Sequence, residues 1–251
     1  MKRVVIMGAS SGIGLELARK LAGAGMRVGV AARSTAKLKE LKEEFPGQVE
    51  YETVDVTAED APRLTGTLIA RLGGMDTYVH VAGVGFSNEE LDPALEMATL
   101  DVNVTGFARM VGYAFRYFRD RNGGKGHIVA VTSVAGTNGI GNLASYSASK
   151  CFDQCYLRAL EQLCTLQKLR IRITDVRPGW VETPLLEENG HYPMLMKVPY
   201  VADRIARAAR QGRRVAVIDW RWNLLAGLWR LIPNRLWVKL PVRAGALASK
   251  P

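Results

Sequence analysis

The stretch Gly8-Ala9-Ser10-Ser11-Gly12-Ile13-Gly14 lies between an apolar run, Lys2–Met7, and a segment with helical spacing, Ile13–Ala24. The apolar run predicts a strand that is buried on both faces. A glycine-rich turn between a strand and a helix is typical of a phosphate site, because the start of a helix offers unpaired N–H groups and the positive end of its dipole. The chain therefore begins with a predicted nucleotide-binding turn.

The three glycines of this turn have different predicted roles. Gly8 permits the tight turn, Gly12 lets the backbone approach a pyrophosphate, and Gly14 lets the helix lie close to the sheet. A plain tight turn is the alternative, since the spacing is G-x-x-x-G-x-G rather than G-x-G-x-x-G. The candidate cofactor-binding residues of the turn are Gly8, Ser10, Ser11, Gly12, Ile13 and Gly14.

Beyond this turn, predicted strands and helices alternate along the chain. Such alternation predicts a parallel sheet with helices on both faces, here a single-domain, doubly wound Rossmann-type α/β fold of about seven strands. We expect the catalytic domain over 1–219, a lid over about 182–199, and a basic C-terminal extension of the same domain over 220–251. The further predicted strands are 27–32, 49–54, 77–81, 126–132, 171–176 and 215–218, and the further helices are 35–45, 59–72, 94–119, 145–167 and 201–210.

Charge is distributed unevenly over the 251 residues. The net charge is +10, yet residues 201–251 hold eleven basic and two acidic residues, which leaves +1 for residues 1–200. A nucleic-acid-binding protein would more commonly carry its basic stripe on the main fold, so we expect no nucleic-acid partner. No stretch of about 18 apolar residues is free of charge, which excludes a multi-span membrane protein.

The second predicted strand ends in Ala31-Ala32-Arg33-Ser34, nineteen residues after Gly14. An NAD site usually has an acidic residue here to bind the ribose 2′-hydroxyl, whereas an arginine suits a 2′-phosphate. Arg33 offers a guanidinium fork and Ser34 a hydroxyl. These two residues predict NADP(H), with a solvated arginine at a strand end as the alternative.

The segment Tyr146-Ser147-Ala148-Ser149-Lys150 lies near the start of a predicted helix, so positions 146 and 150 share a face. A phenol has a pKa of about 10 and is a poor base at neutral pH. A nearby cation favours the phenolate and lowers that pKa, so the tyrosine can exchange a proton with an alcohol or carbonyl oxygen. By itself the pair is also a frequent surface coincidence.

The pair of Tyr146 and Lys150 is more informative because other motifs accompany it in a particular order along the chain. Ser133 ends the fifth predicted strand, at the carboxyl edge where open α/β sheets bind ligands. Taken together, the motifs resemble the short-chain dehydrogenase/reductase family, in its NADP-preferring form, over about residues 2–219. The resemblance rests on Gly8–Gly14, Asp55-Val56, Ala82-Gly83, Asn103, Ser133, Tyr146–Lys150 and Pro178-Gly179.

The resemblance implies a role for each of these residues. Tyr146 is the general acid/base, and Lys150 lowers its pKa and holds the nicotinamide ribose. Ser133 hydrogen-bonds the substrate oxygen, and Asn103 holds a water that relays protons to Lys150. The remaining implied cofactor-binding residues are Asp55, Val56, Ala82, Gly83, Pro178, Gly179, Val181 and Thr183.

One segment departs from the family pattern. Members usually have Asn-Asn-Ala-Gly after the fourth strand, where this chain has His80-Val81-Ala82-Gly83. We expect modest local loosening and a structural role for His80. The three histidines lack the spacing of metal ligands, so we predict no metal. Three cysteines and the lack of a signal-peptide pattern predict a cytoplasmic protein, with attachment to a membrane surface as a further alternative.

The C-terminal segment combines four tryptophans with its basic residues. Trp222, Leu225, Trp229 and Ile232 share one helical face, with Leu228 beside them. Tryptophan and arginine suit the water–lipid interface, so residues 220–240 predict peripheral membrane contact. The alternative is that these tryptophans pack against a second subunit or close the substrate pocket. Family habit implies a homodimer or homotetramer.

The sequence thus predicts an oxidoreductase that transfers a hydride between NADP(H) and an apolar alcohol or carbonyl substrate. We expect carbonyl reduction to be the cellular direction, because NADPH generally supplies reducing power. The alternative is a non-catalytic NADP-binding regulatory or membrane-surface scaffold protein. The complete set of Ser133, Tyr146 and Lys150 argues against that alternative, since a sensor does not need a phenol–ammonium pair.

Overall fold

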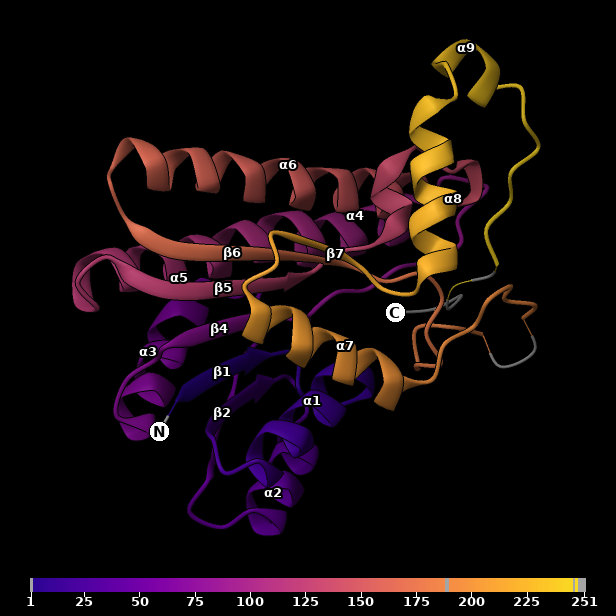
Figure 1. Cartoon of the computed structure of the whole chain (residues 1–251). Coiled ribbons are helices and arrows are strands. Elements are labelled where there is room, and N and C mark those ends of the chain that lie inside the picture. The colour runs from indigo at the N-terminus through magenta and orange to yellow at the C-terminus, as the bar shows by residue number, and fades with distance from the viewer. Residues whose placement is uncertain (1, 188–189, 246, 248–251) are drawn as a thin grey trace.

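The computed structural model describes residues 2–187, 190–245 and 247 (Figure 1). Within them, seven parallel strands form one sheet with the order β3-β2-β1-β4-β5-β6-β7. This confirms the predicted Rossmann-type fold. The strands are β1 (Arg3–Met7), β2 (Arg27–Ala32), β3 (Val49–Thr53), β4 (Thr77–His80), β5 (Lys125–Val131), β6 (Arg170–Arg177) and β7 (Val215–Val217).

The helices follow the predicted segments, with one difference. The helices are α1 (Gly12–Gly23), α2 (Thr35–Glu44), α3 (Ala61–Leu72), α4 (Pro93–Leu100), α5 (Phe107–Arg121), α6 (Ala144–Leu166), α7 (Val198–Gln211), α8 (Trp220–Leu231) and α9 (Asn234–Trp237). The single helix predicted over 94–119 is divided, because Asp101–Gly106 forms a π-helix between α4 and α5. Apolar periodicity does not reveal this change, since one wide turn shifts the pattern by a single residue.

Two hydrophobic cores lie on opposite faces of the sheet, because successive side chains of a strand point to opposite faces. In β1, Val4 and Ile6 join one core and Val5 and Met7 the other. The first core includes residues of α1, α2, α7 and α8, and the second includes residues of α3, α5 and α6. Both faces of the strand are buried, which is why its sequence is continuously apolar.

The chain order places a switch point beside β1. β2 and β3 lie on one side of β1, and β4 to β7 on the other. The loops that leave β1 and β4 therefore diverge, and ligands of open α/β folds bind in the crevice that this divergence creates. In Figure 1, α8 and α9 stand at this carboxyl-end side of the sheet. In the described part of the chain, no helix is long and apolar enough to span a bilayer.

Candidate active site

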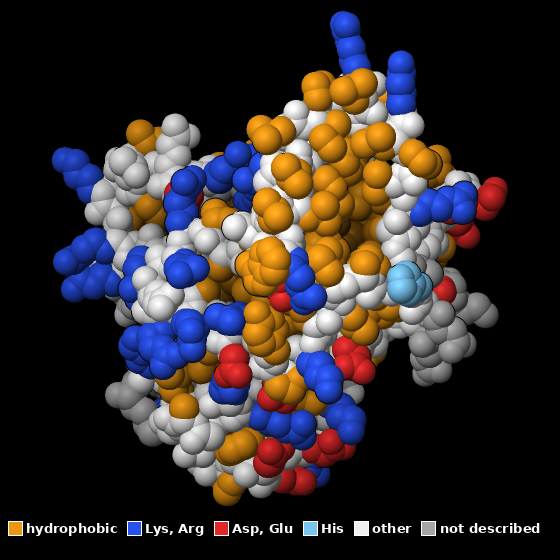
Figure 2. All heavy atoms as spheres, turned by 45° about the vertical axis from the view of Figure 1, so that its right-hand side comes forward, with side chains coloured by type: hydrophobic (Ala, Val, Ile, Leu, Met, Phe, Trp, Pro, Cys, Tyr) orange, Lys and Arg blue, Asp and Glu red, His pale blue; other side chains and the backbone are white. Residues whose placement is uncertain are grey.

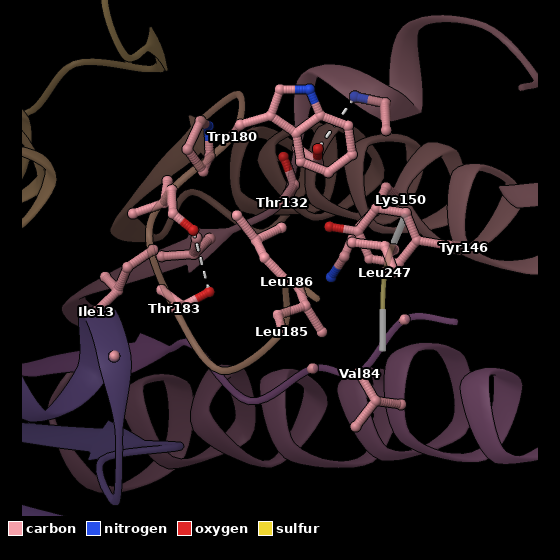
Figure 3. A pocket seen from close by; sticks show the side chains of 18 of the residues that line it. Ile13, Val84, Thr132, Tyr146, Lys150, Trp180, Thr183, Leu185, Leu186 and Leu247 are labelled. Atoms are coloured by element: carbon pink, nitrogen blue, oxygen red, sulfur yellow. Dashed lines mark hydrogen bonds between the residues drawn. The ribbon is translucent and has the colours of Figure 1, made fainter. Parts of the chain in front are cut away.

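A cavity of about 1190 Å³ lies at the carboxyl ends of the strands (Figure 3). It brings together most of the residues that the sequence singled out. Those that line it are Gly8, Ser10, Ser11, Gly12, Ile13, Arg33, Ser34, Asp55, Val56, Ala82, Gly83, Ser133, Tyr146, Lys150, Pro178, Gly179, Val181 and Thr183. The two remaining candidates, Gly14 and Asn103, lie just behind the wall.

The glycine-rich turn is packed so closely that side chains are excluded from it. Gly8 has a φ of 91°, and a Cβ atom there would lie 2.5 Å from the backbone nitrogen of Ala82. A Cβ on Gly14 would lie 2.0 Å from the carbonyl oxygen of Gly8. Gly14 thus brings the start of α1 against the end of β1, which leaves the first turn of the helix open to the cavity.

Two residues of opposite charge line the cavity beyond the glycine-rich turn. Arg33 follows β2, is exposed, and lines the cavity together with Asp55, which follows β3. Burial raises the pKa of Asp55, but hydrogen bonds from the Thr57 N–H and hydroxyl, together with the charge of Arg33, lower it more. Asp55 is therefore held in its turn by Thr57, beside the positive charge of Arg33 at the cavity wall.

Tyr146 and Lys150 project from the first two turns of α6 toward the same part of the cavity (Figure 3). The Lys150 Nζ lies 5.8 Å from the centre of the Tyr146 ring. A Cβ on Gly85 would lie 2.5 Å from Cδ2 of Tyr146, and one on Gly83 would lie 3.4 Å from Nζ of Lys150. The backbone after β4 therefore seats the phenol and the ammonium side by side.

Lys150 also has an anionic partner inside the protein. Its Nζ donates a hydrogen bond to Oδ2 of Asp153 at 3.0 Å, and both side chains are buried. Burial lowers the pKa of Lys150, but the charges of Asp153 and Tyr146 outweigh it, and the net shift is upward. Burial raises the pKa of Asp153 to about 6, against the opposing effect of Lys150. The ion pair with Asp153 therefore favours the charged form of Lys150 beside Tyr146.

Ser133 stands at the end of β5 on a polar shelf. Its Oγ accepts a hydrogen bond from the Ala135 N–H at 3.1 Å, and its carbonyl accepts one from the Gln154 amide at 2.7 Å. Behind it, the Thr132 hydroxyl donates to Asp175, which is paired with the buried Arg177. These contacts hold the hydroxyl of Ser133 at the cavity wall on rigid elements.

Asn103 lies in the π-helical turn and is only 1% exposed. Its amide oxygen accepts from the Val84 N–H at 2.9 Å, and its Nδ2 donates to the Val84 carbonyl at 2.7 Å and to Ser149 Oγ at 3.1 Å. The side chain thus joins the loop after β4 to α6, directly behind Gly83 and Lys150. π-turns commonly occur at functional positions of helices.

The segment after β6 crosses over the glycine-rich turn. Thr183 lies so close that a Cβ on Gly12 would be 3.0 Å from its methyl group. Val181 pairs with Met196 in an isolated β-bridge, which closes the base of the lid predicted over 182–199. Trp222 of α8 covers Gly179, where an added Cβ would lie 2.1 Å from the indole ring. Residues that follow β6 in the sequence therefore cover this part of the cavity.

The C-terminal segment completes the cavity on the side of Tyr146. The amide of Asn142 pairs with both backbone groups of Ala244, and the Leu247 N–H donates to Ser87 Oγ at 2.9 Å. Leu247 is 1% exposed, and it approaches Gly85 from beside Tyr146 (Figure 3). With Leu143, Trp180 and Leu186 it forms part of an apolar cluster.

Residues 2–192 match the family described as short chain dehydrogenase. An uncharacterized oxidoreductase of Myxococcus xanthus is 31% identical over 242 residues, which cover 94% of each chain. The chain belongs to the short-chain dehydrogenase family.

Solved structures of this family share the fold. A variant of actinorhodin polyketide ketoreductase, solved with NADPH, is 26% identical with a TM-score of 0.74, covering 86% of this chain and 95% of that chain. A short-chain dehydrogenase of Sphingobium yanoikuyae in complex with NADPH has a TM-score of 0.77 at 21% identity, and 97% of both chains is covered.

In this short-chain dehydrogenase, His80 lies where the family motif usually has asparagine. It is fully buried, its Nδ1 shares a hydrogen bond of 3.0 Å with the Tyr78 hydroxyl, and its ring meets Phe107 edge-on. Burial, assisted by the charge of Lys150, lowers the pKa of His80 to about 3. The imidazole is therefore neutral and belongs to the core behind the site.

The structure corrects the sequence interpretation of the C-terminal tryptophans. The face formed by Trp222, Leu225 and Trp229 lines the cavity of its own chain, with Trp222 buried and the other two partly buried. The Trp237 ring meets Trp229 edge-on, and its indole N–H donates a hydrogen bond to the Gly139 carbonyl. Leu228, predicted beside this face, is instead 52% exposed. These inner tryptophans therefore help to enclose the cavity of their own chain, as one part of the alternative interpretation predicted.

Several residues at the site were missed by the sequence reasoning. Asp153 follows Lys150 by three positions on the same helix, so its spacing alone could have indicated the pair. Leu247 and the contact between Asn142 and Ala244 gave no such signal, because they join segments that are distant in sequence. Gly85 was passed over because its closeness to Tyr146 is visible only in the fold.

Proposed function

We propose that this short-chain dehydrogenase uses NADP(H) to interconvert an apolar carbonyl compound and its alcohol, with Tyr146 as the general acid/base. The observation that carries the proposal is the cavity itself. One continuous space holds the glycine-rich turn, the pair of Tyr146 and Lys150, and an apolar wall. The known ketoreductase with NADPH is a structural relative with chemistry of this kind.

The cofactor half of the cavity fits a dinucleotide phosphate. Close packing at Gly8 and Gly14 leaves the first turn of α1 open for a pyrophosphate. Arg33 supplies a charged fork for a 2′-phosphate, while Asp55 is engaged by Thr57 rather than directed at a ribose hydroxyl. When bound, the nicotinamide ring supplies the hydride.

The chain itself manages the proton. In the direction of reduction, the Tyr146 hydroxyl gives its proton to the carbonyl oxygen as the alcohol forms. The ammonium of Lys150 stabilises the resulting phenolate, and Asp153 keeps that ammonium charged and in place. Ser133 binds the same oxygen from the end of β5. The buried setting makes these interactions stronger than they would be in water.

The other half of the cavity favours an apolar substrate. Its walls include Phe86, Ile140, Leu143, Leu185, Leu186 and Leu247. Burial of such surfaces is favourable by about 25 cal/mol per Å² of apolar area removed from water, so an aliphatic or aromatic chain gains affinity here.

Turnover of a panel of aliphatic and aromatic ketones with NADPH tests the proposal. We expect Tyr146→Phe to lower kcat by about 10²- to 10⁴-fold, because it removes the general acid, while NADPH binding is retained. Tyr156→Phe, which changes another tyrosine of the same helix, is the matched control and keeps its activity. Binding of NADPH without turnover of any carbonyl or alcohol would instead support a non-catalytic role.

We also propose that the protein works as a homodimer or homotetramer. β7 is the last strand of the sheet, and its Val215 is exposed, so this edge offers backbone groups for pairing with another copy. Light scattering of the purified protein gives the test. A mass of one chain across the working concentration range would contradict the proposal.

A further inference from the structure

Helix α8 has two apolar faces on opposite sides. Trp222, Leu225 and Trp229 recur at helical spacing and line the cavity. On the other side a second series recurs at intervals of four, four and three residues, namely Trp220, Leu224, Leu228 and Leu231. At 3.6 residues per turn these four side chains form one continuous stripe. A helix needs only one such face to pack on its own chain.

The four residues of the outer stripe are all exposed. Trp220 is 73% exposed and Leu231 78%, whereas Trp222 on the inner side is only 4% exposed. The apolar surface continues past the end of α8 with Leu236, Val238 and Leu240, all exposed. We call these seven residues the α8–α9 surface. Contiguous exposed apolar surface on this scale marks an interaction site rather than ordinary surface composition.

The segment that carries the α8–α9 surface contains charges of one sign only. From Trp220 to the end of the chain the sequence has six basic residues and no acidic one. Arg221 pairs with Asp219, and Arg243 lies 3.4 Å from Glu89. Arg230, Arg235 and Lys239 form no ion pair within the described part of the chain. These three cations lie next to the apolar stripe and can bind an anionic partner.

The α8–α9 surface also borders the opening of the cavity. In Figure 2 a hollow with hydrophobic side chains lies beside the upright apolar column where α8 stands in Figure 1, and basic side chains project above it. The inner face of α8 lines that cavity, so stripe and cavity are separated by the thickness of one helix. A partner that covers the stripe therefore lies next to the route by which an apolar molecule enters.

We propose that the α8–α9 surface docks on an anionic lipid membrane. Leucine and tryptophan enter the headgroup–acyl boundary, while Arg230, Arg235 and Lys239 meet lipid phosphates. A second copy of the chain fits less well, because a symmetric contact would place these same cations against each other. Docking brings the cavity mouth to the lipid, which suits the apolar substrate of the proposed function, although the docking itself requires no turnover.

Co-sedimentation of the full-length protein with vesicles tests this proposal. Truncation after Asp219 is unsuitable, because it removes the Trp222 ring from Gly179. We expect binding to vesicles that contain phosphatidylglycerol at low ionic strength, and weaker binding to purely zwitterionic vesicles or at high ionic strength. Replacement of Arg230, Arg235 and Lys239 by glutamine weakens binding by about a hundredfold. Leu228→Asn with Leu231→Asn weakens it by about tenfold or more.

Matched controls distinguish the surface from general charge and hydrophobicity. Leu166→Asn changes a leucine that is 73% exposed at the far end of α6. The triple variant Arg116→Gln, Arg121→Gln and Lys125→Gln removes three charges from the opposite end of the sheet (Figure 1). Both controls keep the wild-type affinity for vesicles. NADPH titration shows that every variant remains folded, independently of whether turnover is found.

Two results would overturn the proposal. The first is full-length protein that binds NADPH yet stays in solution with anionic vesicles at low ionic strength. The second is vesicle binding that the stripe and charge variants leave unchanged. If light scattering shows an oligomer that Leu228→Asn with Leu231→Asn dissociates, the surface is an interface between copies and the membrane assignment is wrong.

Discussion

The two halves of the cavity are built in different ways. The cofactor half is walled by turns that directly follow β1, β2, β3, β4 and β6, so each of these wall residues lies within a few positions of its strand. The apolar half is assembled from five distant segments, around Gly85, Ile140, Leu185, Trp229 and Leu247. Local turn geometry therefore fixes the cofactor half, whereas only long-range packing forms the apolar half.

The largest effect is expected at the tightest point of the cofactor half. A Cβ on Gly14 would meet the backbone oxygen of Gly8, which has no room to move. Overpacking costs up to about 3 kcal/mol in the usual range, and relieving it must displace the turn whose N–H groups face the pyrophosphate, so we expect Gly14→Ala to lower NADPH affinity by about a hundredfold. Fluorescence titration with NADPH measures the loss.

A second glycine of the same helix provides the control. A Cβ on Gly23 would lie 3.8 Å from Phe45, an ordinary contact. Gly23→Ala therefore keeps NADPH affinity and raises helix stability by about 0.5–1 kcal/mol. Equal NADPH binding by the Gly14→Ala and Gly23→Ala proteins would show that the turn is not the pyrophosphate site.

A smaller and more selective effect is expected at Arg33. Loss of one charge-assisted phosphate contact costs about 1.5–3 kcal/mol, so Arg33→Ala weakens NADPH binding by about ten- to a hundredfold and leaves NADH nearly unchanged. Arg27→Ala, at the opposite end of β2, is the control and affects neither cofactor. Equal losses for NADPH and NADH would remove Arg33 from the 2′-phosphate site.

The smallest effect is expected in the apolar half. Leu247→Ala removes a buried side chain beside Gly85 and Tyr146, which enlarges the substrate space. A difference of a methylene in such a pocket is worth about 1–3 kcal/mol, so we expect the ratio of kcat/KM for a long over a short ketone to rise several-fold. NADPH affinity stays the same. An unchanged ratio would show that the C-terminal segment does not limit the substrate.

This comparison also explains how far sequence reasoning reached. The seven strands, their parallel order and the candidate cofactor residues follow from apolar runs and the turns that end them. The π-turn at Asn103 was missed, because the apolar periodicity of the sequence does not indicate it. The hydrogen bonds between the Asn103 side chain and Val84 are visible only in the folded chain. The burial of Asp153 was missed as well, since a charged residue on a helix is ordinarily assigned to solvent.

Helix α8 shows where sequence information ends. Its residues form apolar series on two opposite sides, and the pattern alone does not state which side meets the protein. Trp222 faces inward because Gly179 has no side chain and leaves space for its indole, whereas Trp220 on the other side remains 73% exposed. That fit is a property of two surfaces from different parts of the chain, so only the folded molecule decides it.

By itself, the sequence determined the strand and helix order, the phosphate-binding turn and the spacing of Tyr146 and Lys150, because each depends on neighbours within a few residues. The tertiary structure alone decided that Asn142 and Ser87 fasten the C-terminal segment over the cavity. It also decided which leucines of α8 remain in solvent. These features depend on packing between segments more than a hundred residues apart, and no local pattern records such contacts.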